Sequence, residues 1–162
     1  MGLIPVRAAL GRAPGEALLA IAEVGHEGQN TIGETVSNPK VAAAKHETVP
    51  MTTLDGLVEE HVLARVDVVK LDVEGSEVDA LLGAGKTIER FHPVIQVEAE
   101  TERLASQGRT KDELRQLLGE LDYELCVFDA GTGTLRPALP PGEPEGNAIA
   151  APRGWPQPRY AP

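Results

Sequence analysis

Acidic side chains gather at the ends of two apolar segments, and these are the residues best placed to do chemistry. In DVVKLDVEG, Lys70, Asp72 and Glu74 occupy every second position, so in a strand the three side chains share one face. The segment HPVIQVEAE ends in a similar way, with Glu98 and Glu100. If the two segments are neighbouring parallel strands, their carboxylates meet at the edge where open parallel sheets bind ligands.

A carboxylate cluster at such an edge could serve three purposes. It could accept hydrogen bonds from a polyhydroxyl substrate or a cofactor amine, or it could hold a hard cation such as Mg²⁺. Alternatively, one carboxyl group whose pKa is raised by its neighbours could act as a general base. Lys70 could neutralise part of the cluster or be a structural partner. His26, in the Gly-rich segment GHEGQN, is a further candidate for acid–base chemistry.

Other features of the sequence favour structural interpretations or exclude whole classes of function. Glu77 and Asp79 begin a predicted helix, where carboxylates suit the positive end of the helix dipole. Cys126 lies in the apolar run LCVF, which favours core packing, and a single cysteine cannot form an internal disulfide. The sequence has no zinc-type Cys/His spacing, no P-loop and no GxSxG motif. A net charge of −10 argues against a nucleic-acid partner, and no apolar run reaches the ~20 residues of a membrane span. We therefore expect a cytoplasmic protein with neither nucleic acid nor membrane as a partner.

The elements around the acidic segments alternate between strand and helix patterns, which predicts an α/β fold with a parallel sheet. Helices are expected to begin after Thr53, Ser76 and Thr110, with Asp79 and Glu113 completing capping boxes for the last two. Residues 16–24 could be a strand or a short helix, 25–39 read as a loop, and 46–52 read as extended. Strands are expected at residues 3–10, 66–73, 93–99, 123–128 and 146–151. Residues 1–151 would form one domain, followed by a proline-rich flexible tail at 152–162.

The run from Asp67 to Glu98 resembles the signature of FkbM-type methyltransferases. That signature reads approximately D-x-(apolar)-K-(apolar)-D-(apolar)-E-G-x-E, then a helix with Leu and Gly, then P-(apolar)-(apolar)-x-E. The preceding VPMTTLDGLV and the early Ala9-Leu10-Gly11 followed by Gly15 are also similar to this family, so the resemblance covers about residues 3–151. The matching positions are Asp67, Lys70, Asp72, Glu74, Gly75, Glu77, Leu81, Gly83, Pro93 and Glu98.

The resemblance implies a Rossmann-like methyltransferase sheet that binds S-adenosylmethionine and transfers its methyl group. The acceptor would be a hydroxyl oxygen of a small molecule such as a sugar or natural product. The candidate catalytic residues are then Asp72, Glu74, Lys70 and His26. Asp72 would also contact the cofactor together with Ala9 and Leu10, and Glu98 would bind substrate.

The sequence departs from this family upstream of Asp67, where neither a GxGxxG nor a D-x-G-A-N turn occurs. We therefore expect a C-terminal part of the domain, lacking its first two strands and binding S-adenosylmethionine weakly. The strand at 66–73 would keep an unpaired edge, which favours self-association. Two other functions remain open. One is a non-catalytic remnant that binds carbohydrate or protein, and the other is a sugar enzyme whose carboxylates hold Mg²⁺.

Overall fold

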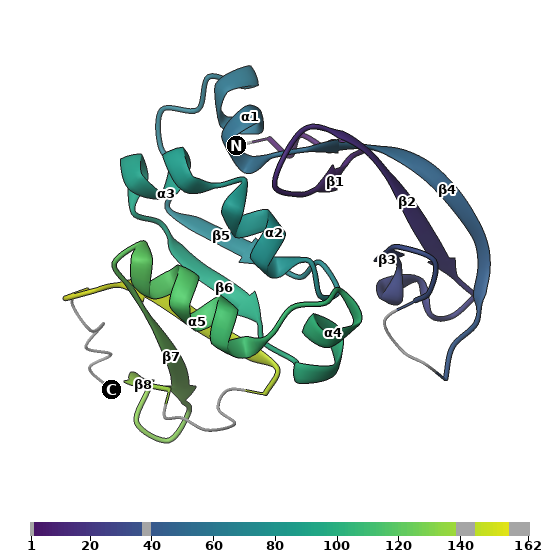
Figure 1. The fold of residues 1–162 in the computed structure, drawn as a ribbon. Coiled ribbons are helices and arrows are strands. Elements are labelled where there is room, and N and C mark those ends of the chain that lie inside the picture. The colour runs from purple at the N-terminus through teal and green to yellow at the C-terminus, as the bar shows by residue number, and fades with distance from the viewer. Residues whose placement is uncertain (1, 37–39, 139–144, 156–162) are drawn as a thin grey trace.

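The computed structural model describes residues 2–36, 40–138 and 145–155, and in this part of the chain the strands form two sheets (Figure 1). The hairpin sheet has the order β1-β4-β2-β3 and comprises β1 (Ala9–Leu10), β2 (Gly15–Ala22), β3 (Thr31–Ile32) and β4 (Ala43–Thr52). The main sheet has the order β5-β6-β9-β7-β8 and comprises β5 (Val68–Leu71), β6 (Val94–Glu98), β7 (Tyr123–Asp129), β8 (Thr134–Pro137) and β9 (Asn147–Pro152). The helices are η1 (Glu27–Gln29), α1 (Leu54–Glu60), α2 (Glu77–Leu82), α3 (Gly85–Phe91), α4 (Thr101–Ser106) and α5 (Lys111–Glu120).

The two acidic segments are adjacent parallel strands, as their pattern predicts. β5 and β6 pair in register from Val68 opposite Val94 to Leu71 opposite Val97. The prediction of a parallel sheet is wrong for the rest of the main sheet, because β9 runs antiparallel to both β6 and β7, and β8 runs antiparallel to β7. Within the described residues β5 pairs only with β6, so the expected unpaired edge is present. Self-association through this edge stays a prediction.

The hairpin sheet is built mainly from two long antiparallel strands. β2 and β4 pair from Gly15 opposite Met51 to Ala22 opposite Ala43, so the segment left open between strand and helix is a strand. The strand predicted at 3–10 comprises only Ala9–Leu10 in the structure, and it pairs in parallel with β4. Residues 3–8 are not part of a strand. Because no neighbouring strand of the described chain covers them, Leu3 is 93% exposed. The segment predicted as a loop at 25–39 contains η1 and β3, and its residues 37–39 lie outside the described part.

Two of the three predicted helix starts have the expected capping bonds. Thr53 accepts a hydrogen bond from the backbone N–H of Gly56 at 3.0 Å and caps α1. Thr110 and Glu113 form a reciprocal capping box at the start of α5. Both bonds satisfy backbone donors that a helix leaves unpaired in its first turn.

The capping box predicted at Ser76 and Asp79 is wrong. Ser76 begins α2 but its side chain makes no capping bond, and its ψ of 15° is not the extended value that a capping residue adopts. Asp79 instead accepts a hydrogen bond from Arg109 Nη2 at 2.6 Å, on the segment before α5. A distant ion pair thus replaces the local capping bond.

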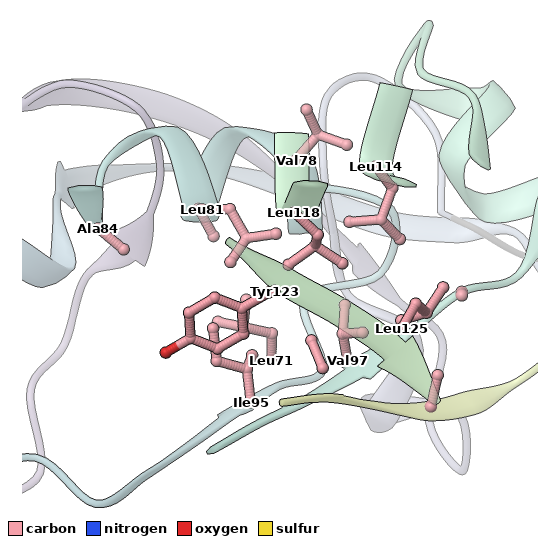
Figure 2. Packing of buried hydrophobic residues seen from close by; sticks show 14 of the residues in the cluster. Leu71, Val78, Leu81, Ala84, Ile95, Val97, Leu114, Leu118, Tyr123 and Leu125 are labelled. Atoms are coloured by element: carbon pink, nitrogen blue, oxygen red, sulfur yellow. The ribbon is translucent and has the colours of Figure 1, made fainter. Parts of the chain in front are cut away.

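The core of the main sheet is almost entirely aliphatic, as the 3% aromatic content requires. Helices α2 and α5 pack against one face of the sheet (Figure 1), and their buried side chains meet those of the strands in Figure 2. Tyr123 is the aromatic member. Its hydroxyl donates to the Pro93 carbonyl at 2.7 Å, and burial raises its pKa to about 12. Cys126 is buried, which confirms its assignment to the core.

Two further expectations concern the C-terminus and the membrane. Pro152 belongs to β9 rather than to the predicted tail, and residues 156–162 of that tail lie outside the described part. In the described ranges, no helix combines the length and apolar character needed to span a bilayer.

Candidate functional site

A cavity of about 430 Å³ lies between the hairpin sheet and the end of β5. Its volume is within the range of small-molecule sites. It brings together Ala9, Leu10 and Asp72, the three residues that the family resemblance implies for cofactor binding. The lining residues are Val6, Arg7, Ala8, Ala9, Leu10, Leu19, Asn30, Ile32, Glu47, Val49, Asp72 and Val73.

Close backbone contacts hold the β1 side of the cavity against α2. Ala9 and Leu10 are fixed by pairing with β4, and Gly11 N–H then donates to the Thr52 carbonyl at 2.9 Å. The backbone of Gly83, at the end of α2, packs so closely on Gly11 that a Cβ at position 83 would clash with the Gly11 carbonyl oxygen. This explains why a glycine stands at position 83 of the signature-like segment.

The turn after β5 presents the acidic side chains, and it has an unusual backbone. Glu74 and Gly75 have φ values of +54° and +102°, a region that L-residues with side chains rarely adopt. A Cβ at position 75 would clash with the Arg103 carbonyl oxygen. Gly75 is therefore required both by its conformation and by the close approach of α4.

The Glu77 side chain stabilises this turn by hydrogen bonds, although the sequence favours only an interaction with the helix dipole for it. Its side chain is buried, and its Oε1 accepts hydrogen bonds from the backbone N–H groups of Val73 at 3.3 Å and Gly75 at 3.2 Å. Burial raises the pKa of Glu77. Its match to the last Glu of the E-G-x-E part of the signature is the sequence signal that could have indicated this role.

Three carboxylates converge beside the cavity, and one guanidinium bridges them. Oxygen atoms of Asp72, Glu74 and Glu98 all lie within 4.8 Å of one another. Arg103 Nη1 contacts Glu74 Oε2 and lies 3.0 Å from Glu98 Oε2, while its Nε donates to Glu100 at 2.7 Å. The sequence pattern does not single out Arg103, because its position follows from how α4 folds back over the sheet edge.

The Glu98 carboxyl group has a strongly raised pKa. Burial raises its pKa to about 7, against the opposing charge of Arg103 and with the help of Glu100, Asp72 and Glu74. Its Oε2 is buried without a hydrogen-bond partner among the described residues, so the contact with Arg103 is an ion pair without hydrogen-bond geometry. A carboxyl group of this kind can exchange a proton at neutral pH.

The two remaining candidates differ in their placement. Lys70 Nζ lies 2.6 Å from Asp72 Oδ2, with both side chains about half exposed, so Lys70 neutralises Asp72 as one of the two interpretations predicts. His26 is exposed in the turn before η1 and is not among the residues that line the cavity. Its catalytic role stays an untested prediction.

The geometry gives the Mg²⁺ hypothesis no support. Asp72, Glu74 and Glu98 are the type of oxygen ligand that Mg²⁺ prefers. Arg103, however, already supplies the positive charge between Glu74 and Glu98. We therefore assign the cluster no metal.

Comparison with known proteins identifies the family. Residues 2–125 match the family model described as the methyltransferase FkbM domain. Comparisons with curated proteins and with solved structures gave no match. The matched range runs from the segment before β1 into β7, and it contains the whole cavity lining and the carboxylate cluster. This chain therefore belongs to the FkbM methyltransferase domain family.

Proposed function

We propose that this protein transfers a methyl group from S-adenosylmethionine to a hydroxyl oxygen of a small molecule of the sugar or natural-product class. Membership of the family supports methyl transfer in general. The observation that carries the finer proposal is the meeting of Ala9, Leu10 and Asp72 in one cavity, although they come from segments about sixty residues apart.

The chemistry of the lining suits S-adenosylmethionine. Leu10, Ile32 and Val49 offer apolar surface for the adenine ring. The carboxylates of Asp72 and Glu47 could accept hydrogen bonds from ribose hydroxyls or the cofactor ammonium, and they favour a cationic sulfonium. The residues present therefore fit the cofactor that the family implies.

The bound cofactor would supply an electrophilic methyl group, and the chain's own residues would prepare the acceptor. Asp72, on the cavity wall, would orient the acceptor hydroxyl by hydrogen bonding. Glu98 would take up the hydroxyl proton, because its pKa of about 7 allows it to be an unprotonated base at neutral pH. Arg103 would keep Glu98 in place and limit the repulsion between the clustered carboxylates.

The first test is an NMR titration of the ¹⁵N-labelled chain with S-adenosylmethionine, because chemical shifts detect binding over a wide range of affinities and identify the residues involved. The proposal predicts shift changes at cavity residues such as Leu10, Ile32 and Val73. Asp72→Asn should reduce the affinity, while Asp112→Asn, on the exposed first turn of α5, should not. An absence of shift changes at saturating cofactor would refute the cofactor assignment.

The second test measures transfer itself. Formation of S-adenosylhomocysteine is followed with a panel of glycosides and other hydroxylated compounds as acceptors. Where an acceptor supports turnover, Asp72→Asn should lower the rate about a hundredfold or more, as expected for a group that engages the reacting hydroxyl. Near-normal turnover by a folded Asp72→Asn variant would refute the role of Asp72.

One observation favours a second candidate function. The carboxylates of Asp72 and Glu47 on the cavity wall could accept hydrogen bonds from sugar hydroxyls without any cofactor. A non-catalytic carbohydrate-binding domain would be distinguished in the same titrations, because glycosides would then shift cavity residues whether or not cofactor is present.

A further inference from the structure

One polar side chain of the cavity lining takes part in no ion pair with the described residues. Asp72 is paired with Lys70, and Glu47 is paired with Arg7 at 3.5 Å. Asn30 is the remaining polar residue of the lining, and it is neutral and half-buried between η1 and β3. Its amide is therefore the polar lining group without an ion-pair partner, and it can donate hydrogen bonds whereas the carboxylates can only accept them.

The orientation of the Asn30 amide follows from its one hydrogen bond. The backbone N–H of Ala22 donates to Asn30 Oδ1 at 2.9 Å. A backbone N–H can only donate, so the oxygen must occupy this side of the amide and Nδ2 the other. Within the described part of the chain, Nδ2 has no hydrogen-bond partner. Asn30 thus combines a fixed position with two unused N–H donors.

The lining beside Asn30 is apolar apart from Glu47, which lies opposite Leu19 and is already paired with Arg7 and Lys45. Leu19 and Ile32 are directly opposite one another in the β2–β3 pair, and both line the cavity. A sugar or an ammonium group would find few partners there. A flat heteroaromatic base, in contrast, offers apolar faces together with ring nitrogens that accept a hydrogen bond.

We propose that Asn30 binds the adenine base of S-adenosylmethionine by donating an Nδ2 hydrogen bond to a ring nitrogen, with Leu19 and Ile32 packing against the base. This inference rests on the proposed function and adds a specificity residue to it. The base would lie against the hairpin-sheet side of the cavity, and Asp72 on the main-sheet side would face the more polar parts of the cofactor.

The protein-side test uses a substitution that separates binding from structure. Asn30→Asp keeps the side-chain volume and the acceptor for Ala22 N–H but removes the donor. Gln116→Glu makes the same amide-to-carboxylate exchange at an exposed position on α5, where Gln116 donates to Glu120 at 2.9 Å, and serves as the control for the added charge. NMR titrations with S-adenosylhomocysteine, adenosine and methionine should show the Kd of the first two rising about fivefold or more in Asn30→Asp. The Kd for methionine and the melting temperature should stay unchanged.

The ligand-side test needs no variant and holds even if Asn30→Asp fails to fold. Adenosine analogues in which N1, N3 or N7 is replaced by carbon are titrated against the wild-type chain, and one of them should bind about fivefold more weakly than adenosine. If all three bind as tightly as adenosine, or if folded Asn30→Asp keeps wild-type affinity for adenosine, the role of Asn30 is refuted. A wild-type chain that binds neither S-adenosylhomocysteine nor adenosine refutes the proposed function itself.

Discussion

Replacing Glu98 with Gln should change the free energy of unfolding in a pH-dependent way. The pKa of Glu98 is raised from its ordinary value of 4.5 to about 7, so the folded state holds this proton more tightly than the unfolded state. Its contribution to stability is fully present below pH 4.5 and is lost as the pH rises through 7. Gln carries no ionisable proton. The stability of Glu98→Gln relative to wild type should therefore rise between pH 5 and pH 8.

The size of this change can be bounded from the structure. Each pH unit of pKa shift corresponds to 1.36 kcal/mol, so the shift sets an upper limit of about 3 kcal/mol. The Glu98 side chain keeps 11% of its exposure, which lets solvent screen the charge and lowers the value. We expect a relative gain of about 1–2 kcal/mol for the variant across this pH range.

Urea denaturation of wild type and Glu98→Gln at pH 5, 6, 7 and 8 measures the effect. Glu124→Gln, at an exposed position on β7, removes one carboxylate from the same sheet and should show no comparable trend. A stability difference that stays constant over the pH range would refute the reasoning. A difference that moves the other way would show that attraction between Arg103 and ionised Glu98 outweighs the burial of the carboxyl group.

Three further substitutions test the turn after β5 and the core by denaturation. Gly75→Ala should cost about 2–4 kcal/mol, because it combines a φ of +102° with a clash against the Arg103 carbonyl. Gly119→Ala, in α5 with open space around it, should instead stabilise by about 0.5–1 kcal/mol, and a similar outcome for both variants would contradict the requirement at Gly75. Tyr123→Phe should cost about 1–2 kcal/mol because the buried Pro93 carbonyl loses its donor, so an unchanged urea midpoint would show that this bond is energetically neutral.

The parts of the structure that the sequence predicts are those with a strong local pattern. The alternation of apolar and charged residues predicts that Lys70, in β5, and Asp72, directly after it, lie on the same side, and right-handed crossovers place β6 beside β5. Thr53 and Thr110 have cap chemistry that depends on residues only three positions away. The convergence of Asp72 with Glu98 follows from these local rules together with the strand order.

The parts that escape prediction depend on distant contacts. Arg103 reaches the carboxylates because α4 turns back over the sheet edge, and Asn30 reaches the cavity because β3 pairs with β2. Ser76 has the right residue type for a capping box, but its expected partner Asp79 instead accepts a hydrogen bond from Arg109, 30 residues further along the chain. In each case, the side chain's role depends on the packing of another element and not on the local sequence pattern alone.

The position of β9 has a consequence for the synthesis of the protein. This strand comprises residues 147–152, yet it lies in the middle of the main sheet, where it separates β6 from β7. On the ribosome, β6 and β7 must emerge long before the strand that joins them. During that interval, each exposes an edge whose backbone groups are later paired with β9. The nascent chain therefore carries two open sheet edges until β9 has left the exit tunnel, and during this interval these edges are exposed to mispairing.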